Sequence, residues 1–211
     1  MFAISMQSLA SNSLHLSWFD AVVLIVLVFG LFRGRKNGMS KEILPLFKWL
    51  AIVFISGLFY SQVAQGLVSL AHLDLLTSNI LGYAILALVV FLIFSMLNRP
   101  LGLKLFGSNL FGSAEYYLGT PSGMVRYACV LIFALAFLNA RHFTPAQIES
   151  DNKYQERWYG AHFFPGWYTV QNQVFEKSCT GPYIRKYVNV LLIEPTTTGG
   201  STVVQNDEPA N

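Results

Sequence analysis

Long apolar runs alternate with short polar segments along the first two thirds of the chain. Four runs are each long enough for a helix to cross a bilayer core of about 30 Å, which takes about 20 residues. They lie at residues 14–32, 43–60, 80–97 and 123–140. The pattern therefore predicts an all-α membrane protein with a transmembrane domain at residues 14–140, built from four helices arranged as two hairpins.

A basic turn separates the first two runs. Its charged and glycine residues are Arg33, Gly34, Arg35, Lys36, Gly38, Lys41 and Glu42. Residues 1–32 and 61–79, by contrast, contain neither lysine nor arginine. Because cytoplasmic loops are enriched in these cations, we expect the turn in the cytoplasm and both termini outside it. We also expect the turn to offer a contact for a partner.

Four ionisable residues lie in or beside the apolar runs: Asp20, Glu42, Lys48 and Arg126. Asp20 fits the first turn of a helix, where a carboxylate complements the helix dipole, and an ion or proton relay is the alternative. Lys48 and Arg126 can extend their charges to the headgroups. For Lys48, pairing with Glu42 or lining a polar path stays open. Glu42 is expected to pair with Arg33 or Arg126 and so brace the first hairpin.

Gly119 and Gly123 form a G-x-x-x-G spacing at the entry to the fourth run. Two small residues one helical turn apart allow two helix backbones to approach closely. We therefore name both as candidate helix-packing residues. Pro121 lies between them, so chance placement in a glycine-rich segment is an equal alternative.

The composition changes after the fourth run. Residues 141–195 mix charged side chains with aromatic clusters, as in elements that lie at a membrane interface, and an aromatic binding site is the alternative. Short amphipathic helices are expected at 166–178 and 182–193. Residues 1–13 are expected to form a flexible tail and residues 196–211 a disordered end.

The overall composition supports the membrane class. Hydrophobic residues make up 54% of the 211 residues, charged residues only 12%, and the mean hydropathy is +0.46. An ordinary soluble domain has about 25% charged residues. The net charge of +3 comes from unevenly placed cations, which suit membrane topology and anionic lipid. We expect the lipid bilayer as a partner and no nucleic acid.

Motifs for catalysis or metal binding are not recognisable. The four histidines have no metal-ligand spacing, and neither a phosphate loop nor a nucleophile elbow occurs. Cys129 and Cys179 lie far apart in the sequence and are expected to be unpaired thiols. We therefore expect neither an enzyme nor a cofactor or metal site.

Three motifs follow one another along the transmembrane region. Trp18 and Asp20 form W-x-D, residues 33–42 form R-G-x-x-x-G-x-x-x-E, and residues 118–126 form L-G-x-x-x-G-x-x-R. Together they resemble the colicin V production protein family, CvpA, over about residues 17–193.

The resemblance implies a bacterial inner-membrane protein associated with toxin (colicin V) production or export and with envelope physiology. Tyr116 and Tyr117 stand where the family usually has an Asp or Asn with an Arg, so the sequence departs from the family pattern at this point. We expect a non-enzymatic assembly or export-support component with periplasmic termini, which acts through membrane-protein partners or as a homo-oligomer. The alternative is a small channel or transport subunit that oligomerises and uses the four ionisable residues named above.

Overall fold

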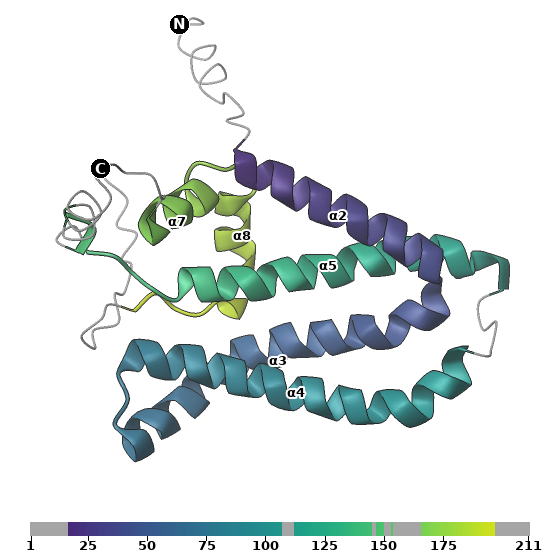
Figure 1. Cartoon of the computed structure of the whole chain (residues 1–211), viewed down its shortest axis with the longest axis horizontal. Coiled ribbons are helices and arrows are strands. Elements are labelled where there is room, and N and C mark those ends of the chain that lie inside the picture. Colours follow the sequence, from purple (N-terminus) through teal and green to yellow (C-terminus); the bar gives the residue numbers. More distant parts are fainter. Residues whose placement is uncertain (1–16, 107–111, 145–146, 150–152, 154–165, 197–211) are drawn as a thin grey trace, which may run out of the picture.

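The computed structural model describes residues 17–106, 112–144, 147–149, 153 and 166–196. Within these ranges the protein is helical, apart from turns and an isolated β-bridge between Arg141 and Thr196. The named elements are α2 (Trp18–Asn37), α3 (Met39–Ala71), α4 (Leu75–Phe106), η1 (Gly112–Ala114), α5 (Glu115–Asn139), α7 (Trp167–Phe175), α8 (Gly181–Val188) and η2 (Asn189–Leu191). Figure 1 shows the long helices α2 to α5, with α7 and α8 grouped at one end.

Three helices are long and apolar enough to cross a membrane. They are α3, residues 75–97 of α4, and α5. α2 is not among them, because Asp20 near its start and Arg33, Arg35 and Lys36 near its end leave a shorter uncharged stretch. The crossing by α2 therefore stays a prediction.

The helices pair differently from the expected hairpins. α3 packs along α4, α2 packs along α5, and α5 also packs against α3. The consecutive helices α2 and α3 contact each other much less. The prediction of two hairpins of neighbouring helices is therefore not confirmed. The physical reason is that the close-packing face of α2 meets α5, as described below.

α3 extends well beyond the apolar run that predicted it. The run covers residues 43–60, whereas the helix continues to Ala71. It ends at His72, which adopts a left-handed conformation (φ 50°) and donates its N–H to the Val68 carbonyl. The 33 residues give a length of about 50 Å, so α3 exceeds a bilayer core of about 30 Å.

The core joins both helix pairs to the C-terminal tail. Tyr83 is fully buried, and the rings of Tyr60, Phe133 and Phe137 lie around it at centroid distances of 5.5 to 6.2 Å. The tail adds four buried side chains to the same cluster: Val174, Phe175, Leu192 and Ile193. The tail is thus part of the folded unit.

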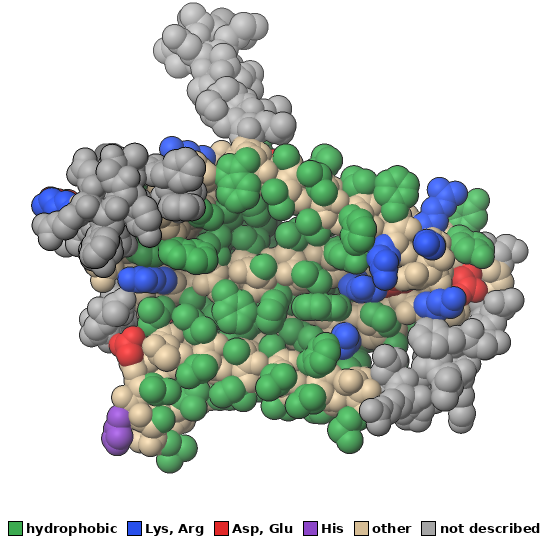
Figure 2. Space-filling model, viewed as in Figure 1, with side chains coloured by type: hydrophobic (Ala, Val, Ile, Leu, Met, Phe, Trp, Pro, Cys, Tyr) green, Lys and Arg blue, Asp and Glu red, His purple; other side chains and the backbone are tan. Residues whose placement is uncertain are grey.

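Hydrophobic side chains also cover the outer faces of the long helices, as Figure 2 shows. Leu24 on α2 is 64% exposed, Leu88 on α4 57% and Phe54 on α3 50%. An exposed apolar surface of this extent suits hydrocarbon and would be unfavourable in water.

The C-terminal tail is tied to the long helices by hydrogen bonds. α7 lies within the first stretch expected to be helical, α8 begins one residue before the second, and η2 continues it. The Asn139 amide on α5 donates to the Ile193 carbonyl at 2.9 Å. The Glu194 N–H donates to the Tyr60 hydroxyl on α3 at 3.0 Å.

Thr196 departs from the expected disordered end. It is buried, and its N–H donates to the Ala140 carbonyl at 3.0 Å. The expectations for residues 1–13 and 197–211, and for residues 154–165 of the aromatic-rich tail, lie outside the described residues.

Candidate functional site

The basic turn is built around Gly38. α2 ends at Asn37 and α3 begins at Met39, so Gly38 alone separates the two helices. Its φ of 76° is a conformation that other residues rarely adopt. The Gly38 N–H donates to the Gly34 carbonyl at 3.0 Å, and its carbonyl accepts from the Glu42 N–H at 3.2 Å. Gly38 therefore determines where the first turn of α3 begins and so positions Glu42.

Glycines hold α2 directly against α5. A Cβ atom built on Gly123 would lie 2.7 Å from the Gly34 Cα, and one on Gly119 would lie 2.9 Å from the Gly38 Cα. Real Cβ atoms essentially never approach so closely, so a side chain at these positions would displace a backbone. Gly30 continues the face on α2, because its own Cβ would lie 3.0 Å from the Gly123 carbonyl oxygen.

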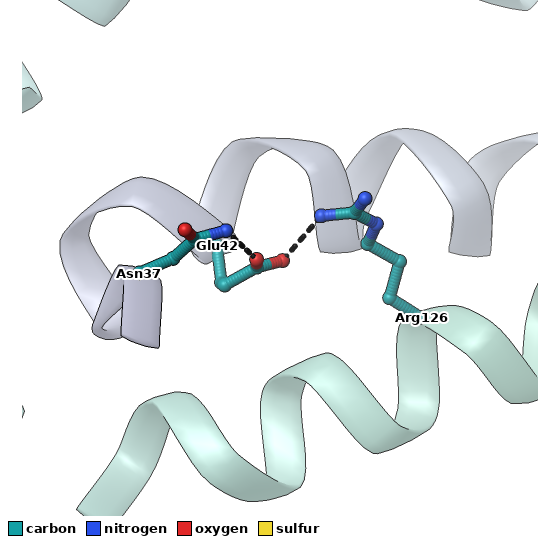
Figure 3. Close-up of polar contacts among 3 residues, drawn as sticks. All are labelled: Asn37, Glu42 and Arg126. Carbon is teal, nitrogen blue, oxygen red and sulfur yellow. Dashed lines mark hydrogen bonds and ion pairs between the residues drawn. The ribbon is translucent and has the colours of Figure 1, made fainter. Parts of the chain in front are cut away.

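Glu42 lies at the centre of a polar cluster where α2, α3 and α5 meet (Figure 3). Its Oε2 accepts from Arg126 Nη1 at 2.6 Å, and its Oε1 accepts from Asn37 Nδ2 at 2.5 Å. Arg126 and Arg33 were both expected as possible partners of Glu42, and in the structure Glu42 pairs with Arg126. The cluster therefore braces α3 against α5.

The free-energy cost of breaking this ion pair depends on its burial. Glu42 is fully buried, and the Arg126 side chain is 19% exposed. Taking two charges out of water costs several kcal/mol each, so a buried pair adds little net stability. Removing one partner, however, leaves the other charge buried and uncompensated, at a cost of about 3–5 kcal/mol. The pair therefore specifies one arrangement of the helices.

The remaining residues of the turn divide by exposure. Gly34 and Gly38 are buried against α5. The four cations are exposed: Arg33, Arg35, Lys36 and Lys41. In the part of the chain that the structure describes, none of these cations forms an ion pair with a carboxylate. The turn thus presents four cations without an ion-pair partner among the described residues, and the Glu115 side chain lies against Gly38.

Lys48 lies between α3 and α4. Its ammonium group lies 4.6 Å from the centroid of the Phe91 ring, a cation–π contact. The described ion pairs do not include it, so pairing with Glu42 is not observed. The side chain is half-buried.

Asp20 lies at the opposite end of α2 and binds the tail. Its Oδ2 accepts from the N–H groups of Ser17 and Cys179, both at 3.0 Å. Its Oδ1 accepts from the Thr180 N–H at 3.1 Å and from the Thr180 hydroxyl at 2.7 Å. This carboxylate therefore joins the start of α2 to the segment between α7 and α8.

The described residues contain no group of three His, Cys, Asp or Glu side chains that could hold a metal ion. Cys129 is buried in α5, and Cys179 is half-buried in the tail, and both are free thiols. The arrangement around Glu42 is thus suited to fixing helices. Both Glu42 carboxylate oxygens accept a hydrogen bond, whereas the buried Arg126 Nε has no partner among the described residues.

Sequence reasoning missed the part that Asn37 takes in the cluster. Its amide reaches Glu42 because Gly38 folds the chain back between them. The sequence feature that could have indicated this contact is an amide residue directly before a glycine at a helix end. Gly30 was likewise overlooked as a packing residue, although it lies four positions before Gly34.

Comparison with protein families decides the identity of the chain. The family model described as Colicin V production protein matches residues 19–166, which is more than half of the sequence. The chain belongs to the colicin V production protein family. Among curated proteins and among solved structures, nothing gives a significant match. The resemblance drawn from the W-x-D and glycine motifs is thereby confirmed.

Membership in the colicin V production protein family, together with three apolar helices, makes this a multi-pass membrane protein. The matched region contains the glycine contact, the Glu42–Arg126 pair and Asp20. It ends at residue 166, before α7 begins. Asp20 thus connects the family region to a tail that the family match does not cover.

Proposed function

We propose that this colicin V production family protein is a non-enzymatic component of the bacterial inner membrane. In this proposal it supports assembly or export in toxin production and envelope physiology. It acts by binding membrane-protein partners or a second copy of itself. The observation that carries the proposal is the basic turn, in which a buried ion pair supports exposed cations.

The charge distribution supports a contact surface at the turn. Four exposed cations without an ion-pair partner among the described residues are free to meet lipid phosphates or an acidic protein surface. The Glu42–Arg126 pair and the glycine contact hold the turn in one conformation. A preorganised surface loses less entropy on binding than a flexible one.

The exposed side chains of α2 support a fourth crossing. Leu24, Ile25, Phe29 and Phe32 are each at least half exposed. A helix with these side chains in water would be unfavourable, whereas its cations would reach the headgroup region at one end. With four crossings and the basic turn in the cytoplasm, both termini lie in the periplasm.

The transport alternative has less support from the contacts. Glu42 and Arg126 bind each other, and the Asp20 carboxylate is occupied by four hydrogen bonds to Ser17, Cys179 and Thr180. Of the four ionisable residues, only Lys48 lacks a described polar partner. We therefore favour the assembly or export-support role.

Site-specific photocrosslinking in cells tests the proposed contact. A photoreactive amino acid in place of Arg33 should give a discrete protein adduct, and Lys36→Gln with Lys41→Gln should weaken that adduct several-fold. The matched control is Lys177→Gln with Lys186→Gln, which removes two exposed lysines from the tail and should leave the adduct unchanged. Equal adducts in both double variants, or none in the parent, would contradict the proposal.

A further inference from the structure

An apolar groove opens between α2, α5 and α7. α2 and α5 touch through their glycines at the basic end and diverge toward the other end, as Figure 1 shows. The tail helices fill part of the opening and leave a cavity of about 670 Å³. Its walls are almost entirely hydrophobic and include Val22, Leu131, Leu138 and Val170. Hydrophobic side chains line the recess between α2 and α5 in Figure 2.

The rim of this groove carries the features of a membrane interface. Trp18 and Trp167 border it and are 50% and 72% exposed. Tryptophan is enriched where the hydrocarbon core meets the headgroups. The groove therefore lies at a depth where its mouth faces headgroups and its interior faces acyl chains.

Arg141 supplies a positive charge at the same groove. Its side chain is exposed, and its guanidinium lies 4.7 Å from the centroid of the Phe143 ring. Within the described ranges, Arg141 has no carboxylate partner. Its carbonyl accepts from Gln171 Nε2 at 3.0 Å, which ties its backbone to α7. A cation beside an apolar cavity matches a ligand with a negative head and a hydrocarbon tail.

We propose that this groove binds an anionic phospholipid of the surrounding bilayer. One acyl chain lies between α2 and α5, and the phosphate contacts the Arg141 guanidinium. The cavity volume falls within the range of about 300–1,000 Å³ that is usual for small-molecule sites. Each buried methylene adds favourable transfer energy, and a guanidinium can bind a phosphate through two hydrogen bonds. This site is independent of the partner contact proposed at the basic turn.

Native mass spectrometry of the purified full chain tests the proposal. Phosphatidylglycerol should bind in preference to phosphatidylcholine of the same chain lengths. Arg141→Gln should weaken phosphatidylglycerol binding roughly tenfold, because it removes a charge-assisted hydrogen bond. Lys177→Gln removes an exposed cation that does not line the groove and should leave binding unchanged.

A second variant tests the apolar part of the site. Ala134 is exposed and lines the groove, so Ala134→Trp should fill it and reduce binding of both lipids several-fold. Ala71→Trp, at an exposed position at the end of α3, is the matched control. Thermal unfolding of each variant shows that the fold is kept. Equal affinity for the two lipids, or unchanged binding in Arg141→Gln or Ala134→Trp, would overturn the proposal.

Discussion

Two carboxylates join parts of the chain that are far apart in sequence. Glu42 reaches Arg126 across 84 positions, and Asp20 reaches Thr180 across 160. Glu42 is fully buried between helices, whereas Asp20 lies at a helix start and is partly exposed. Loss of the first should therefore affect the whole fold, and loss of the second mainly the tail.

Glu42→Gln should lower the free energy of unfolding by about 3 kcal/mol, because Arg126 is left as a largely buried cation without its counter-ion. Glu149→Gln, which breaks an exposed pair with Lys153, should change it by less than about 0.5 kcal/mol. Thermal unfolding in detergent measures both. The double variant Glu42→Gln with Arg126→Gln should cost less than the sum of the single variants. Additive effects, or a Glu42→Gln cost equal to that of the control, would contradict a coupled pair.

Asp20→Ala should release the segment between α7 and α8, because the N–H groups of Cys179 and Thr180 lose their acceptor. Hydrogen exchange of these two amides should accelerate at least tenfold, while exchange within α3 and α4 stays slow. The exposed residue Asp74 offers the control variant Asp74→Ala, for which no change at the two amides is expected. Unaltered exchange in Asp20→Ala would show that the tail is held by other contacts.

At the scale of elements, the glycine faces of α2 and α5 determine how the helices are arranged. They bring the two backbones into contact at the basic end, and the helices diverge from there. The opening accommodates α7 and α8, whose side chains Val174 and Phe175 complete the core. Without hydrophobic attraction between helices in lipid, such close contact supplies much of the packing energy.

Gly34→Ala should destabilise the protein by about 1–3 kcal/mol, because the new methyl group overlaps the backbone of α5. Gly66→Ala is the matched control, since nothing lies within 4 Å of its added Cβ and alanine favours the helix. Unfolding temperatures in detergent should therefore shift down for the first variant and stay equal or rise for the second. The same shift in both would rule out a glycine contact between α2 and α5.

At the scale of the whole molecule, charged side chains lie toward the two ends of the long axis, and apolar surface lies between them. Exposed cations occur at the basic turn and also at the opposite end, where Arg141 lies, and hydrophobic side chains cover the helices between (Figure 2). The proposed orientation places the basic turn in the cytoplasm, because short loops rich in lysine and arginine are retained there.

Cysteine labelling in intact cells tests four crossings. In a Cys129→Ala, Cys179→Ser background, a membrane-impermeant maleimide should label Ser17→Cys, Asp74→Cys and Glu176→Cys from the periplasm. It should label Lys41→Cys only after the cells are lysed. Labelling of Ser17→Cys and Lys41→Cys from the same side would mean that α2 does not cross and that three spans remain.

Local patterns in the sequence were enough for the membrane class, for the three apolar spans and for the family. Uninterrupted hydrophobicity, charge clusters and short motifs are properties of residues close together in the sequence. They can therefore be identified without knowledge of the fold. The approximate places of α7 and α8 followed from the same kind of signal.

Only the tertiary structure decided which helix faces meet. Chain order suggested that α2 pairs with α3, but the glycines of α2 pack against those of α5. A hydropathy pattern does not indicate which two helix backbones have complementary shapes. The partner of Glu42 and the bonding of Asp20 depend on that arrangement, because each contact joins residues from helices or loops that the fold alone brings together.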